Sequence, residues 1–147
     1  MMKWILIGIF AFSLAIGGAL FFVGSGTTGD ASEIDWRILG EMDYIAQKPS
    51  PGLEVLNKKK AKIPGFMVPL EDNQQLVTEF LLVPSPQACI HVPPPPPNQM
   101  VYVKMKKGVP AAQGPIWVYG DFEITVKRSQ YGEASFELIG DYVEPYK

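Results

Sequence analysis

One short segment of the chain holds the residue types best suited to chemistry. Cys89 and His91 are the only cysteine and the only histidine among the 147 residues, and they lie two positions apart. In an extended backbone, residues at this spacing point to the same side, so a thiolate and an imidazole would project together. Both groups are ligands for zinc and copper. The pair therefore indicates a metal site, although it supplies only two ligands.

Other side chains would have to complete such a site. A structural zinc ion takes four ligands, so Glu71 is the predicted third ligand, with water as the fourth. Copper(I) accepts fewer ligands and favours sulfur, which makes Met67 a further candidate. Asn98 is the remaining candidate donor. The expected cofactor is thus a zinc or copper ion.

Two other interpretations of the pair stay open. Cys89 could be buried as a small apolar residue, with His91 hydrogen-bonded to backbone carbonyls of an irregular loop. A redox thiol is disfavoured because the chain has no second cysteine to resolve it. A Cys-His nucleophilic dyad is also disfavoured, because such dyads join residues from distant parts of a chain. The sequence therefore predicts a protein that is not an enzyme.

Five consecutive prolines follow the pair almost at once. Such a run cannot form a helix and favours a stiff, extended polyproline segment. Polyproline segments dock into aromatic grooves of partner proteins. The alternative is internal packing on Trp117, Tyr102 or Tyr119. The predicted partner-binding residues are Pro93, Pro94, Pro95, Pro96, Pro97 and Asn98.

The first 24 residues form a predicted membrane anchor or signal segment. Residues 5–23 carry no charge, and a run of about 19 apolar residues is just long enough to cross a bilayer. Lys3 precedes the run and the next basic residue is Arg37, so the positive-inside rule places the N-terminus in the cytoplasm. We expect a single-pass inner-membrane protein with its domain in the periplasm. The alternative is secretion to the periplasm after cleavage of a signal peptide.

The remainder is expected to form one mainly β domain over residues 32–147, after a flexible linker at residues 25–31. A short amphipathic helix is predicted near residues 32–47, capped by Ser32. Strands are predicted at residues 61–70, 75–83, 99–105, 115–127 and 135–143. The first should bend at Pro64 and Gly65, a turn is expected at residues 106–108, and Gly120 and Asp121 predict a bulge. Five strands fit a small OB-like Greek-key barrel, and an open β-sandwich is the alternative.

The charge of the chain excludes one class of partner. A formal net charge of −2 predicts no binding to nucleic acid. The one basic cluster comprises Lys58, Lys59, Lys60 and Lys62. It indicates a solvated loop and strand start, or else a patch for phosphate or lipid headgroups.

Two longer motifs resemble a known family. Residues 63–71 (IPGFMVPLE) and 89–99 (CIHVPPPPPNQ), with residues 36–39 and 115–120, are similar to the bacterial domain-of-unknown-function family 3299, DUF3299. The resemblance covers roughly residues 35–143.

The resemblance implies an exported or membrane-attached protein of Gram-negative bacteria. Genes of the family tend to lie beside MacB-like ABC transporters and periplasmic metal-binding proteins. It therefore implies these two kinds of partner, and an accessory role in envelope transport or metal homeostasis. A structural adaptor that docks through the proline segment is the alternative function.

Overall fold

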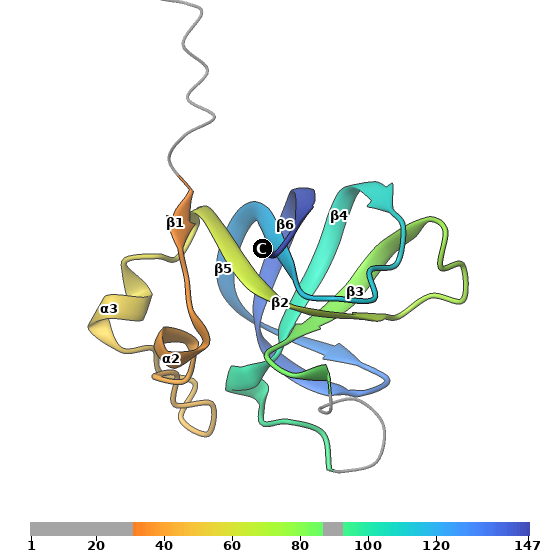
Figure 1. Ribbon diagram of the computed structural model, residues 1–147. Helices are drawn as coiled ribbons and strands as arrows, with labels where there is room; N and C mark the ends of the chain where they lie inside the picture. The colour runs from red at the N-terminus through yellow and green to blue at the C-terminus, as the bar shows by residue number, and fades with distance from the viewer. Residues whose placement is uncertain (1–30, 87–92) are drawn as a thin grey trace, which may run out of the picture.

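The computed structural model describes residues 31–86 and 93–147, which form a mainly β structure (Figure 1). Six strands make one mixed sheet. The helical segments are short: α2 (Trp36–Leu39), α3 (Pro51–Glu54) and the 3-10 turn η2 (Pro97–Gln99). The strands are β1 (Ser32–Glu33), β2 (Lys59–Pro69), β3 (Val77–Val83), β4 (Val101–Val109), β5 (Ile116–Ser129) and β6 (Gly132–Pro145). All five predicted strands are therefore present, and β1 is an additional one.

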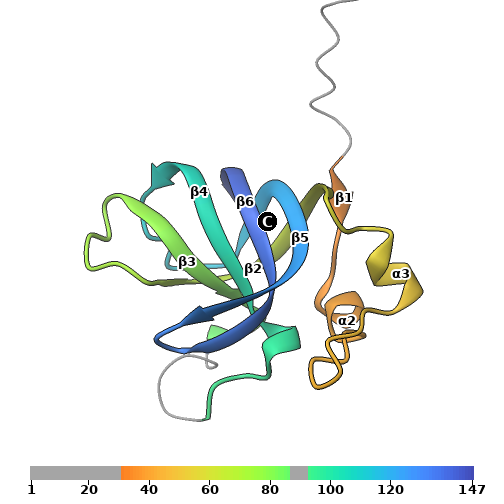
Figure 2. The ribbon, with the colours of Figure 1, turned by 180° about the vertical axis from the view of Figure 1, so that it is seen from behind.

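The strands follow the order β1-β2-β3-β4-β6-β5, and β2 also pairs with β5. The five long strands thus form a closed ring of pairings, which both views show wrapping around a common centre (Figures 1 and 2). The pairs β1–β2 and β4–β6 are parallel, and the others are antiparallel.

The long strand β2 serves two neighbours. Its first part pairs with β5 up to Gly65, and its last four residues, from Phe66, pair with β3. A side chain at position 65 would begin 2.7 Å from the carbonyl oxygen of Val83, so the chain needs a glycine where the two neighbours meet. The predicted bend at Pro64 and Gly65 is therefore the point where β2 changes partner.

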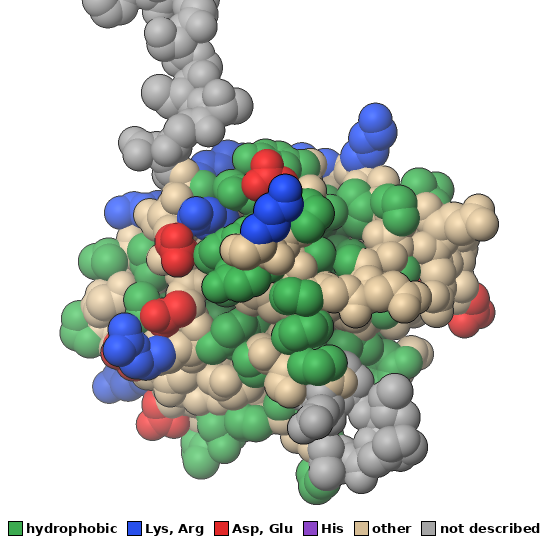
Figure 3. All heavy atoms as spheres, viewed as in Figure 1, with side chains coloured by type: hydrophobic (Ala, Val, Ile, Leu, Met, Phe, Trp, Pro, Cys, Tyr) green, Lys and Arg blue, Asp and Glu red, His purple; other side chains and the backbone are tan. Residues whose placement is uncertain are grey.

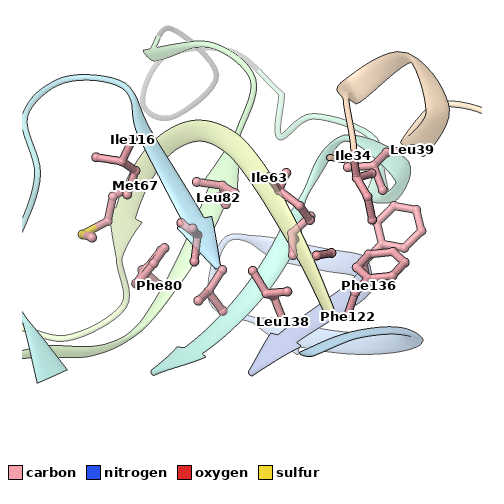
Figure 4. Close-up of a cluster of buried hydrophobic side chains, with 14 of the residues drawn as sticks. Ile34, Leu39, Ile63, Met67, Phe80, Leu82, Ile116, Phe122, Phe136 and Leu138 are labelled. Atoms are coloured by element: carbon pink, nitrogen blue, oxygen red, sulfur yellow. The ribbon is translucent and has the colours of Figure 1, made fainter. Parts of the chain in front are cut away.

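The interior of the ring is filled by alternating residues of its strands. Figure 4 shows side chains from β2, β3, β5 and β6 converging, with Ile34 and Leu39 beside two phenylalanine rings. Those rings, Phe122 and Phe136, have centroids 5.5 Å apart and no exposed surface. Met67 is 8% exposed and belongs to the same cluster, which fits its place in a core strand.

Of the helix predicted over residues 32–47, only the single turn α2 is present. Ser32 does not cap a helix but pairs with Ala61 as part of β1. The helix α2 has one turn and ends at Gly40. It begins after Asp35, whose carboxylate accepts a hydrogen bond from the Ile38 amide at 2.9 Å. At residues 32–34 the open edge of β2 supplied hydrogen bonds that outweighed the helical pattern, because tertiary context overrides local propensity.

Two smaller predictions had different outcomes. The turn predicted at residues 106–108 is wrong, because β4 continues to Val109, which pairs with Val77. The predicted bulge is confirmed by a register shift between Tyr119 and Gly120. A side chain at Gly120 would collide with the backbone of Ile139, so the bulge depends on this glycine.

No helix within residues 31–86 and 93–147 is long and apolar enough to cross a membrane. The predicted membrane segment, residues 5–23, lies outside the described residues.

Candidate functional site

The proline segment lies between β3 and β4, and we call Pro93 to Pro97 the proline rail. Pro93, Pro94 and Pro96 are exposed, whereas Pro95 and Pro97 are partly buried. The Pro96 backbone has φ −62° and ψ 155°, which lies in the polyproline II region. Three exposed rings on a stiff backbone form a surface that could be recognised without much loss of conformational entropy.

The C-terminal end of the rail is fastened to the chain around α2. The amide nitrogen of Asn98 donates hydrogen bonds to the carbonyl oxygens of Gly40 and Met42, both at 3.2 Å. Gln99 donates to the carbonyl oxygen of Trp36 at 3.4 Å. Asn98, predicted as a partner-binding residue, therefore uses its donors within the chain. Its side-chain oxygen is buried and has no hydrogen-bond partner within the described part of the chain.

A small second hydrophobic cluster lies apart from the ring interior. Its buried members are Leu81, Val83, Met100 and Ala134. A side chain at Gly132, at the start of β6, would begin 3.7 Å from Pro94 and 3.4 Å from Met100. The rail therefore passes close to the β5–β6 hairpin. Of the aromatic residues predicted as its internal packing partners, Trp117 packs against Tyr146 with its ring tilted, and Tyr119 stacks on Tyr142.

An open pocket of about 760 Å³ brings two of the predicted ligands together. Met67 and Glu71 both contribute to its lining, as does Pro86. Cys89 and His91 lie outside the described residues, and Pro86 is the last described residue before their segment. Pro86, which lines the pocket, therefore precedes Cys89 by three positions in the sequence.

Glu71 is already occupied by hydrogen bonds. One carboxylate oxygen accepts a hydrogen bond from the Thr78 amide at 3.0 Å, and the other accepts one from the Thr78 hydroxyl. These bonds, led by the one from the hydroxyl, lower the pKa of Glu71. The carboxylate is therefore charged at neutral pH, but a metal ion would have to compete with Thr78 for it. Within the described ranges, no three His, Cys, Asp or Glu residues cluster closely enough to hold a metal ion.

An ion-pair network joins four strands and was missed by the sequence analysis. Lys60 lies 3.0 Å from Asp121 and 2.8 Å from Asp141, and Lys106 lies 3.3 Å and 2.6 Å from the same two carboxylates. The hydrogen bond to Asp141, followed by that to Asp121, raises the pKa of both lysines. The bulge at Gly120 was the available signal, because Asp141 is the unpaired residue in β6 opposite it.

A second polar pair lies on β3 and β4. The hydroxyl of Tyr102 donates a hydrogen bond to Glu79 at 2.9 Å. Burial, together with this hydrogen bond, raises the pKa of Tyr102 to about 12. The phenol therefore stays protonated at physiological pH and acts as a donor, so it is no candidate for a base.

A shallow apolar groove of about 300 Å³ lies where β2 passes from β5 to β3. Trp36, Phe66 and Tyr146 supply its aromatic lining. The indole nitrogen of Trp36 donates to the carbonyl oxygen of Pro64 at 2.6 Å, which fixes one wall of the groove.

The class of protein that emerges is a small, mainly β protein with an exposed proline rail. The sequence model of a family described as "Protein of unknown function (DUF3299)" matches residues 41–145. The chain belongs to this family, which confirms the resemblance found in its sequence motifs.

A solved structure agrees with this assignment. It is the crystal structure, at 2.45 Å resolution, of a DUF3299 family protein from Pseudomonas aeruginosa PAO1. The two proteins share 36% sequence identity with a TM-score of 0.66, and the match covers 81% of this chain and 98% of the other. No curated protein matches the chain.

Proposed function

We propose that the protein is a non-enzymatic adaptor of the bacterial envelope that docks a partner protein through its proline rail. The observation that carries this proposal is the contrast within one loop. Three proline rings are exposed, while the next two residues, Asn98 and Gln99, bind the loop to backbone carbonyls near α2. A rail that is fixed at its end and exposed along its length loses little entropy on docking.

The fold that presents the rail is best described as an OB-like Greek-key barrel. The support is the ring of five long strands closed by β2 and β5, together with the parallel pairing of β4 and β6. The rail lies in the connection between the second and third of these strands. In this type of fold, surface loops between strands carry binding functions.

The proposed location is the periplasm, with residues 5–23 as an inner-membrane anchor. The support is the length of this uncharged run and the absence of basic residues between it and Arg37. The proposed partner is an envelope ABC transporter of the MacB-like type or a periplasmic metal-binding protein. Secretion after signal cleavage would leave the same domain on the same side.

Site-specific photocrosslinking in cells would test the docking surface. A photoreactive amino acid placed at Pro94 should trap a defined partner, whereas one at Pro110, an exposed proline elsewhere, should not. Binding of the trapped partner to the purified full-length protein would then be measured by calorimetry. The triple change Pro93→Ala, Pro94→Ala, Pro96→Ala should weaken binding at least tenfold, and Pro110→Ala should not. Equal adducts at both positions would refute the adaptor proposal.

A second candidate function is binding of zinc or copper by Cys89 and His91. The observation that favours it is the pocket in which Met67, Glu71 and Pro86 meet. Metal content of the full-length protein would be measured for the unmodified chain, Cys89→Ser, His91→Ala and Glu71→Gln. Near-stoichiometric metal that is lost in the first two variants would support the proposal. Because Thr78 already holds Glu71, Glu71→Gln should reduce affinity less than they do. No metal in the unmodified chain would refute the proposal.

A further inference from the structure

Lysines gather at one end of the barrel. We call this the lysine end and define it as Lys58, Lys59 and Lys60 at the start of β2, with Lys106 and Lys107 near the end of β4. All five are exposed. The backbone at Lys58 has φ +60°, a left-handed conformation that is uncommon outside glycine, and its amide donates to the carbonyl oxygen of Phe122 at 2.7 Å. The turn that places this lysine is therefore tied to the barrel wall.

The lysine end carries an excess of positive charge. Its two central lysines, Lys60 on β2 and Lys106 on β4, share the carboxylates of Asp121 and Asp141. These ion pairs hold the start of β2 close to the end of β4. Lys58, Lys59 and Lys107 form no ion pair with any described residue. Five lysines thus face two aspartates, although the whole chain has a net charge of −2. Positive charge is concentrated here, and the rest of the chain is correspondingly acidic.

The N-terminal part of the chain enters the fold at this same end. Strand β1 starts at Ser32 and pairs with Ala61, the neighbour of Lys60. Figures 1 and 2 both place β1, the start of β2 and the end of β4 at one end of the molecule, and the proline rail at the opposite end. In the space-filling view, lysine and arginine side chains are seen near the start of the described chain (Figure 3).

The length of the preceding chain limits how far this end can lie from a membrane. Only residues 24–31 separate the predicted apolar span from β1. Eight residues reach at most about 30 Å when fully extended. A tether of this length keeps the lysines close enough to the bilayer to come within the roughly 8–10 Å over which charges act at physiological salt. Basic side chains held this close to a bilayer are attracted to anionic headgroups.

We propose that the lysine end docks onto anionic phospholipid headgroups of the membrane that anchors the chain. Docking at this end turns the proline rail away from the bilayer, toward partners in the periplasm. Lys58 and Lys59 contact lipid phosphates, Lys107 lies beside this contact without being required for it, and Lys60 and Lys106 remain bound to their aspartates. This inference rests on the membrane anchor of the proposed function.

The test uses the full-length chain with Cys89→Ser, reconstituted in lipid nanodiscs that contain nitroxide-headgroup lipid. A fluorophore is attached to a cysteine at position 107, or at position 130 in the turn of the β5–β6 hairpin, which lies near the rail. In discs with anionic lipid, quenching at position 107 should be several-fold stronger than at position 130. The difference should disappear at about 0.5 M salt. At this ionic strength, surface charges are screened within roughly a few ångströms.

A matched pair of charge variants sharpens the test. Lys58→Gln with Lys59→Gln should abolish most of the extra quenching at position 107. Arg37→Gln with Lys48→Gln also removes two positive charges, from exposed residues outside the lysine end, and should leave quenching unchanged. Equal quenching at positions 107 and 130, or an unchanged difference in purely zwitterionic discs, would overturn the proposal. A change in the fluorescence of the label at position 107 on adding short duplex DNA, without lipid, would assign the lysines to nucleic acid. That result would overturn the proposal as well.

Failure of the anchor is distinguishable from failure of the docking. Extraction of membranes at high pH reports whether the chain is an integral membrane protein. A chain released by this treatment would refute the anchor, and the docking proposal with it. A chain that resists extraction but shows no difference between the two labels would refute the docking alone and leave the anchor in place.

Discussion

The barrel wall and the β3–β4 loop are stabilised in different ways. The wall is held by continuous strand pairing and by an interior cluster in which large side chains such as Phe80 and Phe136 are fully buried. In the part of the β3–β4 loop that the structure describes, the end of the proline rail is fastened by side-chain hydrogen bonds from Asn98 and Gln99. The comparison teaches that the loop can change with little risk to the fold, whereas the wall cannot, because cooperative packing is lost as a unit.

The largest effect should come from a side chain added where the wall is tightest. Gly120→Ala should destabilise the protein by more than about 3 kcal/mol or prevent folding, because backbone atoms of β6 occupy the space. The matched control is Gly114→Ala, since nothing lies within 4 Å of a side chain at that position. Urea unfolding of both variants checks the prediction. Equal stability of the two would show that the bulge can shift register.

The next largest effect should come from a cavity in the interior. Phe136→Ala should cost about 3–5 kcal/mol, because the residue is fully buried and packs on Phe122. Ile45→Ala, at a side chain that is 86% exposed, should change stability by less than about 0.5 kcal/mol. Thermal unfolding of both variants measures the difference. A small effect of Phe136→Ala would mean that the ring closes over the missing volume.

The wall was also the part that the sequence predicted best. Alternating residues such as Ala61, Ile63 and Met67 mark one buried face of β2, and this period of two is visible without a structure. The start of the predicted helix, at residues 32–34, failed because its competitor was the open edge of β2, a partner that is remote in sequence. Local patterns predict faces of elements, but they do not show which edges remain free.

The candidate site was predictable only in part. A run of five prolines predicts a stiff segment from sequence alone, because the ring restricts φ. The role of Asn98 was not predictable, since its partners Gly40 and Met42 are backbone carbonyls more than fifty residues away. Likewise, Glu71 was predicted as a metal ligand, and its hydrogen bonds to Thr78 depend on where β3 begins. The metal-binding role of Cys89 and His91 stays a prediction.

A smaller effect is expected where the loop is fastened. Asn98→Ala should cost about 1–2 kcal/mol, because two neutral hydrogen bonds to backbone carbonyls are lost. Asn98→Asp keeps the size but replaces the donor with an acceptor facing the same carbonyls, so it should cost more than the alanine. Gln99→Ala should cost less, because the hydrogen bond from Gln99 to Trp36 is long and its other one goes to the carbonyl oxygen of the adjacent Asn98. Urea unfolding ranks the three, and an alanine that costs more than the aspartate would contradict the assigned orientation of the amide.

The smallest effect on stability should come from Asp141, whose carboxylate forms ion pairs with Lys60 and Lys106 of the lysine end. The size of this effect should depend on pH. Burial raises the pKa of this carboxyl, but hydrogen bonds from Lys106 and Lys60 outweigh burial, so its pKa is lowered overall. A lowered pKa in the folded state contributes stability that is present above the unfolded value of about 4 and is lost as pH falls below it. Asp141→Asn should therefore cost no more than about 1 kcal/mol at pH 7, as is usual for exposed ion pairs, and less at pH 3.

The control for this last prediction is Asp72→Asn, at an exposed aspartate that forms no ion pair within the described ranges of the chain. Urea unfolding from pH 7 to pH 3 should give a difference between unmodified protein and Asp141→Asn that narrows toward acid. The corresponding difference for Asp72→Asn should stay flat. A constant difference for both would mean that the four-strand network adds no pH-dependent stability.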